Sequence, residues 1–454
     1  MTLISIDIGS TWTKGVKFAF SAQGQLEFVA RAAHPTTVDN LCRGFNAVFE
    51  VLVAEDDTHE LFYSSSAKGG LAVASIGIVP EITAEMARIA AHSAGAKLTH
   101  SFAYDLTHAD IVALQQSNPD IVLLAGGSDG GNARYPVENA KKLAQAALAS
   151  TIVYAGNRHV RDEVEEILGG HDLICVDNLL PALDCPNPEP ARNAIRDVFL
   201  RKITTGKGLD LIIRATGREP CPTPFALYEY ARAIGELAPH FGEFVLIDMG
   251  GATTDVYSYH EEINTLGTIR RGLPEPKIKR TVEGDLGMRV SARAAAEARR
   301  VLLAPSEGAG DAAFDRYLDK VTATPETLPD TPLEKRYDVS LAEANITTSL
   351  MRHAGRAHEV CTAEGMVTVQ TGRDLTRVSQ IIGTGGYLSH AVGFDPRHSI
   401  SRLGFDAHGK RVLAPCGGRY HRDPDGLFPL LANVARGYPA QAVEKGLHAL
   451  ITHP

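Results

Sequence analysis

Apolar and polar residues alternate in two short runs that lie far apart in the chain. Residues 3–20 read LISIDIGSTWTKGVKFAF, and residues 246–259 read LIDMGGATTDVYSY. In each run an apolar segment leads to an aspartate, then to a turn of glycine and hydroxyl residues, and then to a second alternating segment. Alternation with a period of two is typical of a half-buried strand. Both runs are therefore predicted to form β-hairpins with tight turns that contain glycine.

Outside the hairpins, strand-like runs alternate with helix-like runs, which indicates an α/β protein. Buried strands are predicted at 121–125 and 151–155. Helices are predicted at 137–150, 161–170, 191–206 and 289–304. The segment 305–338 is poor in aliphatic residues, so we expect a surface excursion there, with one short helix around FDRYLDKV.

Glycine turns follow strand-like runs at four places: IDIGST at 6, LLAGGSDGG at 123, LIDMGGATTD at 246 and IIGTGG at 381. An aspartate-bearing turn is thus followed twice by a bare glycine turn. Gly9 and Gly126 are 117 residues apart, and Gly250 and Gly385 are 135 residues apart. This spacing predicts a duplicated domain that faces its copy, with 125–131 in the place that GTGG takes in the other half.

Length and composition limit the classes of function. The chain has 454 residues, which suggests two or more domains, and a formal net charge of −9. The negative charge argues against nucleic acid, because phosphate backbones bind to basic surfaces. No run approaches 18 apolar residues and no signal segment precedes the first strand, so we expect a cytoplasmic protein without a membrane span. The six cysteines form no C-x-x-C pair and are expected to be reduced thiols.

The two hairpin turns have the chemistry of a phosphate site. Glycine lets the backbone approach a ligand closely, and turn amides bind phosphate oxygens. Asp7 and Asp248 are anions, so they fit such a site if Mg²⁺ and its water lie between them and the phosphates. Either carboxylate could then orient or deprotonate an attacking water. The alternative interpretation is two ordinary hairpins with solvated aspartates. The candidate phosphate-binding residues are Gly9, Ser10, Thr11, Thr13, Lys14, Gly250, Gly251, Thr253 and Thr254.

The two hairpin motifs resemble the first and second phosphate motifs of the actin-like ATPase superfamily, and IIGTGGYLSHA at 381–391 resembles its adenosine motif. The resemblance implies an α/β fold of two ribonuclease-H-like domains with ATP or ADP and Mg²⁺ in the cleft between them. It implies that Asp7 and Asp248 are catalytic, and that both hold Mg²⁺ through water together with Asp255. Beside the adenosine it places Gly383, Gly385 and Gly386. The implied domains are a first domain at 1–185, a helical connection at 186–240, a second domain at 241–415, and a C-terminal helical segment at 416–454 that packs back on the cleft or the first domain.

A second resemblance covers nearly the whole chain. It rests on SSSAKGGL (64–71), GIVPEITAEMARIAAHSAGAKL (77–98), DIVLLAGGSDGGN (120–132), VYAGN (153–157), VDNLLP (176–181) and TVEGDLG (281–287). Together these segments resemble the glutamate-mutase-associated accessory proteins, whose genes accompany adenosylcobalamin-dependent mutases. The resemblance implies a slow Mg²⁺-dependent ATPase that reactivates a mutase rather than a metabolic enzyme. The chain lacks a D-x-H-x-x-G motif, so we expect it to bind no cobalamin of its own.

Several alternatives stay open at this point. A small-molecule kinase, an ATP-dependent amidohydrolase and a nucleotide-binding scaffold without turnover would share the fold. The turn at 125–131 could be a second ligand site or a tight connection. Glu283 and Asp285 could reach the metal or only begin a helix. The sequence leaves undecided which mutase is served, which nucleotide state binds it, and whether the protein is a monomer or a homodimer.

Overall fold

The protein is an α/β chain that divides into two compact units in a computed structural model. The structure describes residues 2–53, 58–66, 71–183, 185–203, 208–263, 265–272, 275–302, 312–363 and 365–453. The first unit consists of Met1–Gly69, Lys207–Arg271 and Glu275–Pro454, and the second consists of Gly70–Gly206 with Gly272–Pro274. The expected domain boundaries at 185, 240 and 415 stay predictions.

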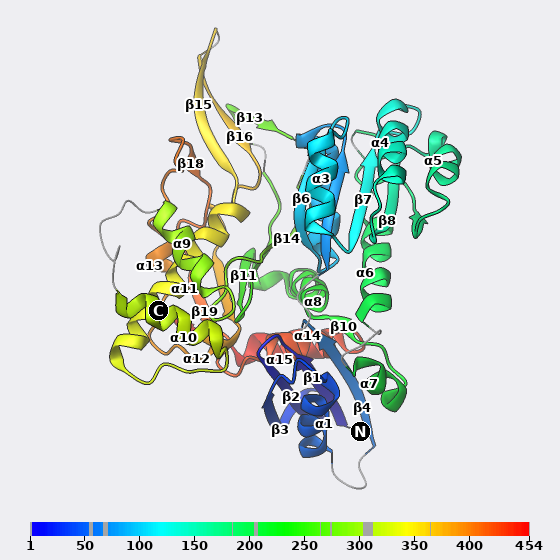
Figure 1. The fold of residues 1–454 in the computed structure, drawn as a ribbon. Coiled ribbons are helices and arrows are strands. Elements are labelled where there is room, and N and C mark those ends of the chain that lie inside the picture. The colour runs from blue at the N-terminus through cyan, green and yellow to red at the C-terminus, as the bar shows by residue number, and fades with distance from the viewer. Residues whose placement is uncertain are drawn as a thin grey trace. The chain divides into compact units, whose positions relative to one another are not determined.

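The first hairpin opens a five-stranded sheet of the first unit, with strand order β10-β4-β1-β2-β3 (Figure 1). Its strands are β1 (Thr2–Ile8), β2 (Trp12–Phe20), β3 (Leu26–Pro35), β4 (His59–Ser65) and β10 (Cys221–Pro222). β2 is antiparallel to β1, and β4 is parallel to it. Leu3, Ile4, Ile6 and Ile8 are fully buried, so β1 is a central strand of the sheet with apolar contacts on both faces.

The second hairpin opens a six-stranded sheet in the same unit, with strand order β14-β12-β11-β17-β19-β20 (Figure 1). Its strands are β11 (Phe244–Met249), β12 (Thr254–Tyr259), β14 (Ile278–Glu283), β17 (Gln380–Thr384), β19 (Arg419–Arg422) and β20 (Ile451–His453). Here too the second strand of the hairpin is antiparallel to the first, and the fourth strand is parallel to it. Both predicted hairpins are therefore confirmed.

The two sheets repeat one topology. Numbered along the chain within each half, the strands lie in the order 3-2-1-4-5 in both sheets, and β20 extends the second sheet. The predicted α/β fold with two ribonuclease-H-like domains is confirmed by this repeat. A helix follows the fifth strand in each half: α8 (Thr223–Leu237) after β10, and α14 (Phe428–Val434) after β19. These two helices pack on each other, and α14 also contacts β1 and β4. Their contact belongs to one apolar core that includes residues of both hairpins.

Further helices cover the sheets of the first unit. In the first half, α1 (Leu41–Leu52) begins where the Asn40 side chain accepts a hydrogen bond from the Cys42 amide, and it buries Phe45 and Val48. In the second half, α10 (Ala312–Ala323) lies within the segment expected to be a surface excursion, and it buries Tyr317, Leu318 and Val321. The remaining helices are α7 (Leu209–Thr216), α9 (Ala292–Leu302), α11 (Pro332–His353), α12 (Gly386–His390), α13 (Arg397–Ile400) and α15 (Pro439–Ala449). A separate four-stranded sheet consists of β13 (Thr268–Arg271), β15 (Arg356–Thr362), β16 (Gly365–Thr371) and β18 (Arg411–Val412).

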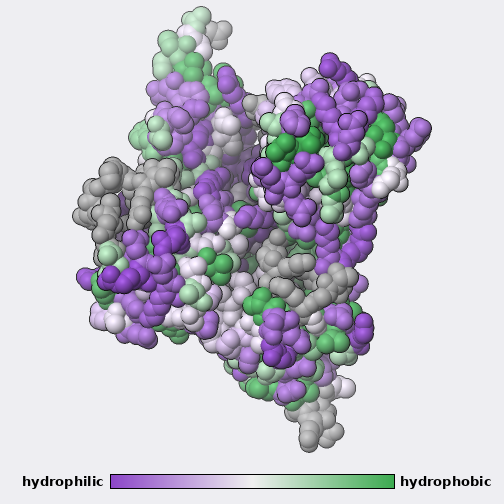
Figure 2. Space-filling model, viewed as in Figure 1, coloured by the Kyte–Doolittle hydropathy of each residue, from purple (hydrophilic) through white to green (hydrophobic). Residues whose placement is uncertain are grey.

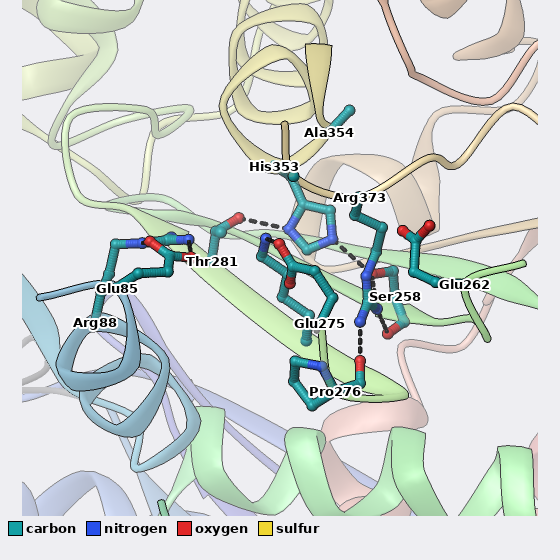
Figure 3. A network of polar contacts seen from close by, with 12 residues as sticks. Glu85, Arg88, Ser258, Glu262, Glu275, Pro276, Thr281, His353, Ala354 and Arg373 are labelled. Carbon is teal, nitrogen blue, oxygen red and sulfur yellow. Dashed lines mark hydrogen bonds and ion pairs between the residues drawn. The ribbon is translucent and has the colours of Figure 1, made fainter. Parts of the chain in front are cut away.

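A fully buried arginine fixes the far end of the second hairpin (Figure 3). The Arg373 guanidinium donates to the backbone oxygen of Ser258 on β12 at 3.0 Å and to its hydroxyl at 2.9 Å. It also donates to the carbonyl oxygens of Lys277, at 3.2 Å, and Pro276. His353, at the end of α11, contacts the same Ser258 hydroxyl at 2.7 Å. One charged side chain thus joins β12 to the start of β14, which keeps the strand behind the turn in place.

The second unit has its own parallel sheet, with strand order β6-β5-β7-β8-β9. Its strands are β5 (Ala72–Gly77), β6 (Lys97–Ala103), β7 (Ile121–Gly126), β8 (Thr151–Gly156) and β9 (Leu173–Cys175). Its helices are α2 (Glu85–Ser93), α3 (His108–Ser117), α4 (Arg134–Gln145), α5 (Arg161–Leu168) and α6 (Glu189–Ile203). This is a doubly wound arrangement, with crossover helices between parallel strands. The buried strands predicted at 121–125 and 151–155 are confirmed as β7 and β8.

The second unit corrects one prediction from glycine spacing. The turn at 125–131 follows β7 in the second unit, so it is not the counterpart of the GTGG turn that follows β17. In the second half Asp248 lies opposite Thr384 of β17, and in the first half Asp7 lies opposite Ser64 of β4. The counterpart is therefore the end of β4, and residues 67–70 lie outside the described residues. The spacing misled because a complete sheet is inserted between the fourth and fifth strands of the first half.

On the face drawn in Figure 2, hydrophilic residues predominate and hydrophobic residues lie in small scattered groups. No helix among the described residues has the length and apolar character needed to span a bilayer.

We expect His421 on β19 to make the fold less stable below neutral pH. Its ring lies between the Gln380 side-chain oxygen at 2.7 Å and the Thr452 hydroxyl at 3.0 Å, and burial together with Arg419 lowers its pKa. The unfolded chain, with a histidine pKa of about 6.5, then binds more protons than the folded chain, so the free energy of unfolding falls as the pH drops below that value. Urea unfolding at pH 7.5 and pH 5.5 should show a loss about 1 kcal/mol larger for the native protein than for a His421→Gln variant. An equal loss in both proteins would contradict this assignment.

Candidate functional site

The two hairpin turns have the same geometry. In the first, the Gly9 amide donates to the Trp12 carbonyl oxygen at 3.1 Å; in the second, the Gly250 amide donates to the Thr253 carbonyl oxygen at 2.9 Å. Gly9 and Gly250 each lie two residues after the aspartate of their hairpin. Asp7 pairs with Lys14, and Asp248 pairs with Asp255, across the two strands. The four-residue tips 9–12 and 250–253 are therefore structural equivalents, each with an aspartate at its base.

Most backbone carbonyl groups of the two tips accept hydrogen bonds. In the first tip, the Thr36 hydroxyl donates to Gly9 O at 2.8 Å and the Thr36 amide donates to Thr11 O at 2.9 Å. In the second tip, Gly250, Gly251 and Ala252 each accept at their carbonyl oxygen; the donors are the amides of Met288 and Arg289 and the hydroxyl of Ser291, at 3.1, 2.8 and 2.7 Å. In both halves the donors lie in the segment that follows the third strand of the sheet. These bonds fix the tips and occupy most of their carbonyl groups.

Amide groups in the middle of each tip have no acceptor among the described residues. Among the described residues, nothing accepts a hydrogen bond from the backbone N–H of Ser10, Thr11, Gly251 or Ala252. All four residues are partly exposed. A turn with free donors and occupied acceptors binds anions, phosphate above all. The tips also meet, because a Cβ atom on Gly251 would lie 2.8 Å from Cγ2 of Thr11. Two anion-binding turns from separate halves thus come together at one place.

Asp7 is held by two hydroxyl groups from other parts of the first unit. Its Oδ1 accepts from the Thr223 hydroxyl at 2.6 Å and from the Ser64 hydroxyl at 2.9 Å. Burial raises the pKa of Asp7, while the Thr223 and Ser64 hydroxyls and the charge of Lys14 act in the opposite direction. The two donors orient the carboxylate and leave Oδ2 for a ligand.

Asp248 has no comparable support. Among the described residues no donor reaches its carboxylate. Burial and the neighbouring charges of Asp255 and Asp7 raise the pKa of Asp248 to about 7. Anions crowded in this way fit a site that receives a cation. In the described part of the chain, no three His, Cys, Asp or Glu side chains could hold a metal ion directly. A Mg²⁺ ion here would therefore need water and phosphate oxygens among its ligands, as this ion commonly has.

Asp255 lies opposite Asp248 across the second hairpin and is already paired. Arg280 donates to its Oδ1 from Nε at 2.9 Å and also from Nη2, and the Thr253 hydroxyl donates to Oδ2 at 3.2 Å. Asp255 and Arg280 are both buried. Glu283 and Asp285, the other candidate acids, both accept from Arg352, at 2.6 and 2.8 Å. The participation of Asp255 in metal binding through water stays a prediction.

Two of the predicted hydroxyl ligands lie in the interior. Thr13 and Thr254 occupy equivalent positions, and both are fully buried. The Thr13 hydroxyl shares a hydrogen bond with the Thr36 hydroxyl at 3.1 Å, while the Thr254 hydroxyl has no partner among the described residues. Ser10, Thr11 and Thr253 lie at the tips themselves and are partly exposed. The structure thus separates the candidate ligands at the tips from the two that face the core.

The glycine turn after β17 contacts the second hairpin. Gly385 has a φ of +94°, and a Cβ atom there would lie 2.3 Å from the Met249 carbonyl oxygen and 2.8 Å from Asp248 Oδ1. Only glycine permits this approach. Gly386 opens α12 and faces open space, whereas Gly383 packs against the Tyr420 side chain. The structure therefore brings Gly385 and Gly386 to the aspartate site, and it directs Gly383 to the core.

Sequence reasoning missed the side chains that hold the tips and Asp7: Ser64, Thr223, Thr36 and Ser291. Ser64 and Thr223 lie 57 and 216 residues from Asp7 in the chain, and no local pattern marks either one. The serine run at 64–66 was the only available signal, because consecutive hydroxyl residues at the end of a buried strand are an unusual choice for ordinary packing.

Comparison with known proteins gives a consistent family match. The model of the MutL protein family matches residues 3–447. "Protein MutL" of Clostridium tetanomorphum is 35% identical over 461 residues, which cover 96% of this chain and 96% of that protein.

Solved structures are similar at a much lower level. The structure titled "Glycerol dehydratase reactivase" is 10% identical, covers 96% of this chain and 100% of that chain, and has a TM-score of 0.35. The activator of the 2-hydroxyisocaproyl-CoA dehydratase from Clostridium difficile with bound ADPNP is 9% identical, covers 100% of both chains, and has a TM-score of 0.31. Both TM-scores lie well below those of closely similar folds.

Proposed function

Because the chain belongs to the MutL protein family, we propose that it is an accessory protein that binds ATP with Mg²⁺, hydrolyses it slowly, and reactivates an adenosylcobalamin-dependent mutase of the glutamate mutase or amino mutase type. One observation carries the nucleotide part of this proposal. Two equivalent turns from separate halves meet with free amides at Ser10, Thr11, Gly251 and Ala252, and each has an aspartate at its base.

The two tips would hold the phosphates of the nucleotide from opposite sides. Free amides supply fixed donors that need no rearrangement when the ligand arrives, and Lys14 supplies a positive charge on the same hairpin as Asp7. Bound Mg²⁺ would neutralise phosphate charge and relieve the repulsion between Asp7 and Asp248. The glycine turn at Gly385 and Gly386 would take the adenosine end, beside the second tip.

The unequal surroundings of the two aspartates suggest unequal roles. Asp7 is fixed by two hydroxyl donors, which suits a carboxylate that orients metal-bound water. Asp248 receives no donor from the described residues, so its oxygens are free to accept a proton from an attacking water. We assign the positioning of the ion mainly to Asp7 and the activation of water mainly to Asp248.

The location of the site would link nucleotide state to partner binding. Each half contributes one tip, so a triphosphate that contacts both tips favours the arrangement in which Thr11 and Gly251 meet. Loss of the γ-phosphate would weaken that preference, and a partner with different affinity for the two arrangements would be bound and released in turn. A mutase that carries damaged cofactor is the partner we propose.

Reactivation of an inactivated mutase tests the proposal. A glutamate mutase or amino mutase is inactivated with hydroxocobalamin and then incubated with adenosylcobalamin and this protein. We expect activity to return when ATP and Mg²⁺ are both present, and to stay low when either is omitted or when a non-hydrolysable ATP analogue replaces ATP. Mutase activity is measured as product formed after removal of free cobalamin.

Three outcomes would contradict the proposal in different ways. Recovery without ATP would remove hydrolysis from the mechanism. Turnover of ATP that rises with a sugar or a carboxylic acid, and not with a mutase, would indicate a kinase. Absence of Mg²⁺–ATP binding in a calorimetric titration would reject the nucleotide site itself.

A further inference from the structure

A buried asparagine on α14 reaches the aspartate of the first hairpin through one serine. Asn433 is fully buried, and its Nδ2 donates to the Ser64 hydroxyl at 2.9 Å and to the Ile6 carbonyl oxygen at 3.1 Å. The Ser64 hydroxyl in turn lies 2.9 Å from Asp7 Oδ1. α14 contacts β1 and β4 along this face (Figure 1). A residue near the C-terminus is thus two hydrogen bonds away from a candidate catalytic carboxylate.

The donor and the acceptor of each hydrogen bond from Asn433 through Ser64 to Asp7 can be identified. A backbone carbonyl can only accept, so the Asn433 atom that faces Ile6 O must be the amide nitrogen. The same nitrogen faces the Ser64 oxygen, which therefore accepts. The single hydroxyl proton of Ser64 is then free to point at Asp7 Oδ1. Asn433 in this way occupies an acceptor site of the Ser64 oxygen and holds the hydroxyl with its proton directed at Asp7.

Asn433 also lowers the stability of the fold at this position. Its Oδ1 is buried without a hydrogen-bond partner among the described residues. A buried polar atom without a partner destabilises a fold, and an aliphatic residue of similar size would avoid that cost. Departures of this kind occur where a site requires a particular side chain.

From these contacts we propose that Asn433 is a positioning residue for Asp7, acting through Ser64, in the ATP hydrolysis described under Proposed function, on which this inference rests. Loss of the Asn433 amide leaves the Ser64 proton free to rotate, and Asp7 then loses one of its two donors. The carboxylate gains mobility, while the amides that bind phosphate are unchanged. The effect should therefore fall on kcat and not on the KM for ATP.

Ser5 on β1, which also contacts α14, provides a matched control. The Ser5 hydroxyl donates to the Leu430 carbonyl oxygen at 2.7 Å, and so ties β1 to α14 without touching Asp7. Its oxygen also accepts a longer hydrogen bond from Asn433 Nδ2, at 3.4 Å. Ser5→Ala removes both of these buried bonds between β1 and α14. The two Nδ2 protons of Asn433 keep the Ile6 carbonyl oxygen and the Ser64 hydroxyl as their shorter-range acceptors, so the bonds from Asn433 through Ser64 to Asp7 stay intact. A purely structural role for Asn433 would make Ser5→Ala and the Asn433 variants alike.

The test compares steady-state hydrolysis of Mg²⁺–ATP in four variants. Asn433→Asp keeps the size of the side chain and replaces the donor by an acceptor; Ser64→Ala removes the link. Each should lower kcat about tenfold and change the KM for ATP less than about twofold, because a hydrogen bond to a carboxylate is lost only at the reacting centre. The double variant should also lose about tenfold rather than a hundredfold, since both changes break one chain of bonds. Ser5→Ala should keep the kcat of the native protein.

A wild-type kcat in Asn433→Asp, or multiplicative losses in the double variant, would overturn the inference and leave the proposed function standing. Crystal structures of the nucleotide-free Asn433→Asp and Ser64→Ala proteins give a second measurement that does not depend on turnover. We expect the Asp7 side chain to lose its single conformation in both. An Asp7 carboxylate that keeps its position in both variants would reject the inference. Absence of ATP hydrolysis by the native protein is a different result, and it would reject the proposed function.

Discussion

Replacement of Asp248 by asparagine should lower the kcat of ATP hydrolysis by about 10²- to 10⁴-fold, the usual contribution of a general base. The carboxylate has no hydrogen-bond donor among the described residues, and it lies beside the free amides of the second tip. Asparagine keeps the shape of the side chain but cannot accept a proton at neutral pH. The tips are unchanged, so the KM for ATP should move by less than about threefold. Steady-state phosphate release at saturating Mg²⁺–ATP measures both quantities.

The same substitution should make the nucleotide-free protein more stable. Asp248 is crowded by Asp7 and Asp255, so a neutral side chain removes repulsion that the fold otherwise bears. In EDTA at pH 8, the free energy of unfolding should rise by about 1 kcal/mol or more. Asp39→Asn alters an exposed aspartate that forms a surface ion pair with Arg43, and it should change neither turnover nor stability. Lower stability together with native turnover in Asp248→Asn would remove Asp248 from the site.

The hairpins could be predicted because their determinants are local. Alternating apolar residues specify the strands, and glycine with short polar residues specifies the turn, all within 18 residues. The repeat of an aspartate before the turn then pointed to two equivalent elements, and the common 3-2-1-4-5 strand order confirms the two halves.

The inserted sheet of the second unit could not be placed from the sequence. Two glycines stand at the end of its strand β7 (126–127) and two stand just after β17 (385–386), and a glycine turn after a strand has a similar local sequence in any α/β sheet. Which strand a turn belongs to depends on pairing between segments distant in the chain, such as β1 with β4 and β11 with β17. Chain spacing carries no information on that pairing when a whole sheet intervenes.

The residues that hold the site aspartates in place could not be predicted from the local sequence either. Asp7 depends on Ser64, Thr223 and, through Ser64, Asn433, which come from three separate segments. Asp255 had the pattern of a metal ligand, because it stands in a motif rich in acids and hydroxyls, yet the structure pairs it with Arg280. Whether a carboxylate is free or paired is decided by tertiary contacts, and the sequence motif alone cannot distinguish the two.

Replacement of Arg280 by methionine should destabilise the protein by about 3 to 5 kcal/mol, because it leaves the Asp255 carboxylate buried without its partner. The unpaired charge would also lie next to Asp248, whose pKa Asp255 already raises. Chemical denaturation of the nucleotide-free protein measures the loss. The exposed pair Arg293 and Asp319 provides a matched control, since Arg293→Met removes the same kind of side chain at the surface and should leave stability nearly unchanged.

A double variant separates the destabilisation caused by an unpaired buried charge from the net contribution of the ion pair to the free energy of unfolding. Asp255→Asn with Arg280→Met removes both charges, so it should lose clearly less stability than Arg280→Met alone. Losses that simply add would mean that Asp255 and Arg280 act independently, against the bonds from Nε and Nη2 to Asp255. If the double variant is stable but turns over ATP slowly, Arg280 serves mainly to hold the negatively charged Asp255 carboxylate in place beside Asp248. If turnover is preserved as well, Asp255 has no part in binding the metal ion, and the site depends on Asp7 and Asp248 alone.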